Sequence, residues 1–222
     1  GAPDPPREAI RAMGTNAIPT LLKWISYEWS PSEQSRETGE AAPRWHRHTL
    51  STEERADSTP GGFAALGAVA RPAIPELTRL ARTSSRPKRA ERCAVALTGI
   101  GPEAIPSLLS LATNGPPCTR YWAVYALEYF ARKPEGVQIV PVLIKCLSDT
   151  NTDFSVAGPA QRALIAVAPA VAVLALTNAL QSSSAQTRLA ALGCLFIFEG
   201  EDPRITPAVV PLFRAAMRDS DR

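Results

Sequence analysis

A short segment that ends one helix and begins the next recurs along this chain. It reads AIRAMGTNAIP at 9–19, ALGAVARPAIP at 65–75 and ALTGIGPEAIP at 96–106. Weaker copies occur at 163–173 (ALIAVAPAVAV) and around Pro141 and Pro211. Glycine favours the end of a helix, and proline is tolerated in a first turn, where its missing N–H is harmless. An internal repeat of this kind predicts a repeat architecture in which each helix pair stacks on its neighbours.

The segments between these joints have helical periodicity. Ile18, Leu21, Leu22 and Ile25 form one apolar stripe at helical spacing. No run shows the period-two alternation, bounded by hairpin turns, that would indicate strands. Helices with one apolar stripe must bury it against one another, so we expect an all-α fold: a right-handed α-solenoid of about six helix pairs.

The regular spacing breaks once, near the start of the chain. Pro19 and Pro75 are 56 positions apart, whereas Pro75 and Pro106 are 31 positions apart. We therefore expect a polar insert at about 26–60 between the first two repeats. Ser51 and Glu54 have the spacing of a capping box, which predicts a helix start. Pro60-Gly61-Gly62 is expected to interrupt that helix. The insert also holds Trp45, His46 and His48, and we favour a binding loop, or a cover over the first repeats, over a metal site.

Composition excludes several classes of function. The net charge is +3, from 24 basic and 21 acidic residues, which is too slight to indicate a nucleic-acid partner. Four cysteines without a CxxC pair indicate buried thiols rather than a zinc or disulfide framework. No apolar run reaches the length of a membrane span. No nucleophile elbow, phosphate loop, zinc-protease or dinucleotide motif occurs, so we predict no catalytic residue, metal or cofactor.

The best-formed repeat resembles a known family. It has Ala104-Ile105-Pro106-Ser107-Leu108 at one helix start, Asn114 in a polar turn, then Arg120 and Ala123-Val124-Tyr125-Ala126-Leu127, and Arg188 matches Arg120 by register. These features resemble HEAT repeats, specifically the short HEAT-like repeats of phycobilisome-lyase proteins. The segment GTNAIPTLLKW at 14–24 is similar to bacterial HEAT-repeat proteins. The resemblance implies one HEAT-like, armadillo-like domain over 1–222. Both ends look like interior repeats, so we expect either a piece of a longer array or ends capped by irregular structure.

The resemblance also implies where a partner binds. In such proteins the second helix of each pair lines the concave face of the superhelix. The expected partner-binding residues are Arg120, Tyr121, Tyr125, Glu128, Arg162 and Arg188, with Trp45, His46 and His48 of the insert. The expected function is a non-enzymatic scaffold that binds another protein or peptide. The competing interpretation of the aromatic stretch at 120–130 is core packing between repeats.

Two other functions remain open from the sequence. A resemblance to HEAT-like DNA glycosylases would imply that DNA binds on a basic concave surface with tryptophan, aspartate and arginine side chains. The candidates here are Arg120, Trp122, Arg162 and Arg188, although no aspartate matches. A bilin-lyase-like role rests on the family resemblance alone. The basic run RTSSRPKRAER at 82–92 has two interpretations, a phosphate-binding rim or a solvated turn.

Overall fold

The structure of the chain is a computed structural model that describes residues 5–28, 51–84, 86–149, 151, 153–201 and 211. Within these ranges the regular elements are α-helices and short 3-10 helices, and no strand occurs. The α-helices are α1 (Pro5–Met13), α2 (Ile18–Ile25), α4 (Thr52–Leu66), α5 (Ile74–Arg82), α6 (Pro87–Ile100), α7 (Ile105–Asn114), α8 (Pro117–Ala131), α9 (Val140–Cys146), α10 (Ala157–Ala166), α11 (Pro169–Ala179) and α12 (Ala185–Glu201). The 3-10 helices are η1 (Gly14–Ala17), η3 (Gly67–Ala73), η4 (Pro102–Ala104) and η5 (Pro134–Ile139). The weaker copy of the joint around Pro211 lies outside the described residues, apart from Pro211 itself.

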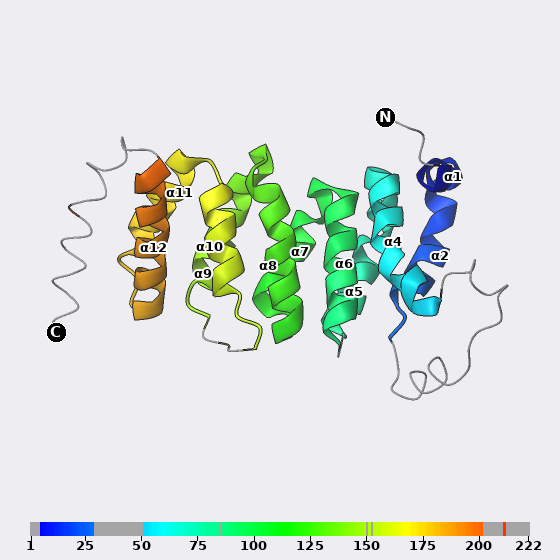
Figure 1. Cartoon of the computed structure of the whole chain (residues 1–222), viewed down its shortest axis with the longest axis horizontal. Coiled ribbons are helices and arrows are strands. Elements are labelled where there is room, and N and C mark those ends of the chain that lie inside the picture. Colours follow the sequence, from blue (N-terminus) through cyan, green and yellow to red (C-terminus); the bar gives the residue numbers. More distant parts are fainter. Residues whose placement is uncertain are drawn as a thin grey trace. The chain divides into compact units, whose positions relative to one another are not determined.

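The helices group into two compact units, Gly1–Leu111 and Ala112–Arg222. In the first unit α4 packs between α2 and α6, and α5 packs on α6. In the second unit α8, α10 and α12 stand side by side, and α9 and α11 form a second layer behind them (Figure 1). The all-α fold of stacked helix pairs is as the repeat predicted. A single domain over 1–222 stays a prediction.

The repeated joints contain the backbone features that their sequence indicates. Gly14 and Gly67 both have φ of +55°, in the left-handed region where a Cβ is unfavourable. Each is followed by a 3-10 turn and then by a helix with proline in its first turn. The glycine therefore ends one helix while the proline begins the next, and the chain turns sharply between them.

Helix α4 corrects one prediction. Ser51 caps it with the expected capping box, in which Glu54 N donates to Ser51 Oγ at 3.2 Å and Ser51 N donates to Glu54 Oε2 at 2.7 Å. The bond from Ser51 N lowers the pKa of Glu54 below its ordinary value. The prediction that Pro60-Gly61-Gly62 breaks the helix is wrong, because α4 continues to Leu66. Gly62 is buried there, and a Cβ would lie 2.7 Å from a methyl of Leu21, so a larger residue would displace Leu21 at the contact with α2.

Helix α8 begins at Pro117, and Thr119 is buried inside it. Proline is favoured at the first helical position because its ring presets φ and its missing N–H would have had no partner. The two consecutive prolines, Pro116 and Pro117, therefore set the helix start without a side-chain cap.

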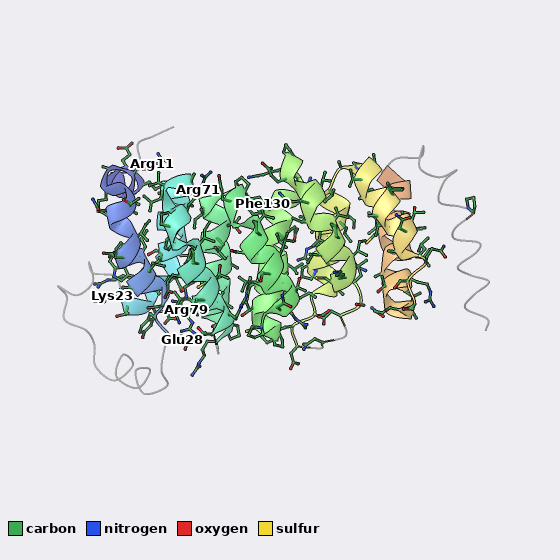
Figure 2. The ribbon with its side chains drawn as sticks, turned by 180° about the vertical axis from the view of Figure 1, so that it is seen from behind. Arg11, Lys23, Glu28, Arg71, Arg79 and Phe130 are labelled. Atoms are coloured by element: carbon green, nitrogen blue, oxygen red, sulfur yellow. The ribbon has the colours of Figure 1, made fainter. Side chains whose placement is uncertain are left out.

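Charged side chains of the first unit lie at two opposite edges, with Arg11 and Arg71 at one and Lys23, Glu28 and Arg79 at the other (Figure 2). Arg11 Nε donates to the carbonyl of Ala65 at 3.2 Å, and Arg71 pairs with Glu103. Arg79 pairs with Glu76 at 2.6 Å, one turn away on α5. The first two contacts link neighbouring joints of the unit, whereas the third lies within one helix.

The basic run at 82–92 is partly internal to the fold. Arg89 Nε lies 2.9 Å from Glu28 Oε1, and its guanidinium also donates to the carbonyl of Thr83 at 2.8 Å. The side chain of Arg92 is 6% exposed and pairs with Asp57 at 3.4 Å. Two of the run's cations are therefore committed to contacts within the unit. Arg82, Arg86 and Lys88 are exposed.

Candidate functional site

Helix α8 carries four of the predicted partner-binding residues, and its sequence separates a buried face from an outward face. Ala123, Val124, Leu127 and Phe130 are buried at helical spacing. Tyr125 and Tyr129 lie on the outward side, 46% and 56% exposed. The core interpretation of the aromatic stretch is therefore right for Phe130, while two of the tyrosines face solvent.

The outward rings of α8 are held by edge-to-face contacts. Trp122 lies edge-on to Tyr121 and to Tyr125, with centroid distances of 5.3 and 5.5 Å. Tyr121 also meets Phe154 at 6.4 Å, on the loop that precedes α10. Aromatic pairs at such distances add about 0.5–1.5 kcal/mol beyond area burial. These contacts restrict the orientations that the rings can adopt in the free protein.

Tyr129 is a candidate that the sequence reasoning missed. The ammonium of Lys133 lies 3.7 Å from the centroid of its ring, and the ring is edge-on to Phe130 at 5.3 Å. The sequence spacing could have identified it, because Tyr129 follows Tyr125 by four positions and residues at that spacing lie on the same side of a helix.

Glu128 and Arg162 join α8 to α10 on this same outward side. Arg162 Nε donates to Glu128 Oε2 at 3.3 Å, and the two side chains are 51% and 32% exposed. An ion pair this exposed contributes roughly 0–1 kcal/mol, so it has little structural importance. Both groups remain accessible to a ligand.

Arg120 and Arg188, by contrast, hold turns of the second unit. Arg120 donates to Asp149 Oδ1 at 3.1 Å, and Asp149 Oδ2 accepts from the backbone N–H of Val156 at 3.0 Å. Arg188 donates to the carbonyls of Ser182 and Ser183 at 2.8 and 3.1 Å. The two arginines occupy equivalent repeat positions, and both fix the turn beside their helix.

We define the outward face of the second unit as the solvent-facing side chains of α8, α10 and α12. Four of the predicted residues on it are accessible or half-buried: Tyr121, Tyr125, Glu128 and Arg162. The structure adds exposed apolar side chains at Tyr129, Leu189 and Ile197. The remaining predicted residues, Trp45, His46 and His48, lie outside the described residues.

All four cysteines are buried, as expected of core positions. Burial raises the pKa of Cys93 to about 12 and that of Cys146 and Cys194 to about 11, so the thiols stay protonated at neutral pH. Across the described ranges, no three His, Cys, Asp or Glu side chains come together as metal ligands would. None of the described helices has both the length and the apolar character needed to span a bilayer.

Comparison with solved structures identifies the fold. The chain superposes on the crystal structure of Kap121p, a HEAT-repeat α-solenoid, with a TM-score of 0.52 and 17% sequence identity. The match covers 92% of this chain and 23% of that chain. The all-α HEAT-repeat-like solenoid fold is therefore confirmed. The phycobilisome-lyase type and the bacterial origin stay predictions.

Two other comparisons gave no relative. No protein-family model matches the chain, and no curated protein matches it.

Proposed function

We propose that this protein is a non-enzymatic interaction module that binds another protein on the outward face of its second unit. The observation that carries the proposal is the pair of exposed, ordered tyrosines on α8, Tyr125 and Tyr129. Aromatic side chains are enriched at protein interfaces, where a few anchors supply most of the binding energy. Neither ring is needed to fill the core, because Phe130 and Leu127 already do so.

The fold supports the same proposal. Stacked helix pairs present an extended surface, and HEAT-repeat solenoids such as Kap121p share this architecture. A partner would meet rings fixed by their contacts with Trp122 and Lys133, so little side-chain entropy is lost on binding. Glu128 and Arg162 supply accessible polar groups beside the rings. We further propose that this face lies on the concave side of the superhelix, and that the insert contributes to binding.

Affinity capture from a lysate of the source cells tests the proposal. The immobilised proteins are the wild type and the double variant Tyr125→Ala, Tyr129→Ala, with recovered proteins quantified by mass spectrometry. Truncating an anchor residue weakens binding by about 2 kcal/mol or more, which corresponds to more than tenfold in affinity. We therefore expect the double variant to recover at least about tenfold less of the specific partner.

The matched control is Leu174→Ala. Leu174 is 64% exposed on α11, in the other helix layer of the same unit. The substitution therefore removes an exposed apolar side chain and leaves α8 unchanged. We expect this variant to recover the partner as the wild type does. Equal recovery on all three proteins would show that the outward face does not bind.

A further inference from the structure

Two adjoining hollows lie on the second unit. The first, of about 490 Å³, lies between the turn after α8 and the turn from α10 to α11, and Arg132, Lys133, Val137 and Pro169 line it. The second, of about 320 Å³, lies between α10 and α12, and Arg162, Gly193 and Ile197 line it. Ile165 lines both. We call the two together the α10 groove.

The α10 groove has an apolar floor with room for side chains. Val137 is 51% exposed and Ile197 is 45% exposed at its two ends, with Ile165 half-buried between them. Gly158 of α10 and Gly193 of α12 line the second hollow. A Cβ at either position would have no other atom within 4 Å. The glycines thus leave a space that apolar side chains of a ligand can fill.

The charged side chains that line the groove all carry one sign. They are Arg132, Lys133 and Arg162, and no carboxylate is among the described residues that line either hollow. Arg132 and Lys133 are exposed and Lys133 packs over Tyr129. Glu128 pairs with one nitrogen of Arg162 from outside the groove, which leaves the other guanidinium donors available.

We infer that the α10 groove binds a peptide segment of the partner that combines acidic and apolar side chains. Three cations without a lining carboxylate complement a segment carrying two or three Asp or Glu residues. The apolar floor distinguishes such a segment from nucleic acid, because phosphate contacts require cations and not exposed Ile and Val side chains. This inference rests on the proposed function and names the chemistry of its partner.

A phage-displayed library of random 12-residue peptides, panned against the full chain, tests the inference. We expect the selected peptides to be enriched in Asp and Glu together with Leu, Ile or Phe. Binding of the resulting consensus peptide is then measured by fluorescence anisotropy. Reversing two cations with Arg132→Glu and Lys133→Glu replaces two attractions to the peptide's carboxylates by two repulsions, so binding should weaken by about tenfold or more.

Two further variants separate charge from shape. Lys23→Glu with Lys145→Glu makes the same change of net charge at exposed lysines that do not line the groove, and should leave affinity within about twofold. Gly193→Leu fills the second hollow with a side chain that helices favour, and should weaken binding without loss of the fold.

Three outcomes would overturn the inference. In the first, the selection enriches no peptide, or enriches peptides without Asp and Glu. In the second, the affinity for the consensus peptide is unchanged by the Arg132 and Lys133 reversal. In the third, polyglutamate or duplex DNA binds as tightly as the consensus peptide. The proposed function is judged separately by the tyrosine variants. The double variant Tyr125→Ala, Tyr129→Ala could lose the partner while the selected peptides show no enrichment in Asp and Glu. That result would support the proposed interaction module and contradict only the inference that its partner segment is acidic.

Discussion

Replacing Phe130 by alanine is expected to lower the free energy of unfolding by about 3–5 kcal/mol. The ring is fully buried, and Leu127 and Ala131 are buried on the same helix. Removing it loses the transfer free energy of the ring and leaves a cavity that the surrounding helices fill only in part. Urea unfolding followed by circular dichroism measures the change.

The adjacent residue gives the matched control. Tyr129→Ala removes a ring of similar size that is 56% exposed, so we expect a loss of roughly 1 kcal/mol or less. That difference between neighbours follows from the division of α8 into a core side and an outward face. Equal losses at Phe130 and Tyr129 would contradict that division, and with it the assignment of Tyr129 to binding.

Asp149→Ala is expected to cost about 2–3 kcal/mol. The carboxylate is 13% exposed, and it accepts bonds from Arg120 at 3.1 Å and from the N–H of Val156 at 3.0 Å. Without it, the N–H of Val156, a residue that is 2% exposed, loses its acceptor, and Arg120 loses its counter-ion. A buried donor without a partner costs about 1–3 kcal/mol, whereas Arg120, 28% exposed, is partly compensated by water.

Asp153→Ala is the control for Asp149. It makes the same change of charge in the same loop, but Asp153 is exposed, so we expect a change within about 0.5 kcal/mol. Thermal or urea unfolding of the two variants in parallel measures the difference. A loss at Asp149 no larger than that at Asp153 would mean that the contact with Arg120 and Val156 does not hold the turn.

Much of the fold could be predicted from the joints alone. A glycine at positive φ followed by proline in a first turn is a local feature, because both residues act through their own backbone. Gly14 and Gly67 therefore identify helix ends without any knowledge of the neighbouring helices. Gly62 shows where that reasoning fails, since its role is set by Leu21 on another helix and not by its own conformation.

The candidate site could be predicted less well. The resemblance to HEAT repeats placed Tyr125 and Glu128 on an accessible face, but it could not show that Arg120 is committed to Asp149, which is 29 positions away. The α10 groove was not foreseen because Arg132, Lys133 and Arg162 come from different repeats and meet only through the packing of α8 against α10. Contacts between repeats leave no periodic signal within one helix.

Hydrogen–deuterium exchange of the full chain, with and without the partner that depends on Tyr125 and Tyr129, tests the central claim most directly. The claim is that a protein partner binds the outward face of the second unit. We expect exchange to slow in peptides that cover α8 and α10, while α9 and the part of α11 beyond its first turn stay unchanged. Slower exchange confined to α9 and α11, or to the first unit, would contradict the claim.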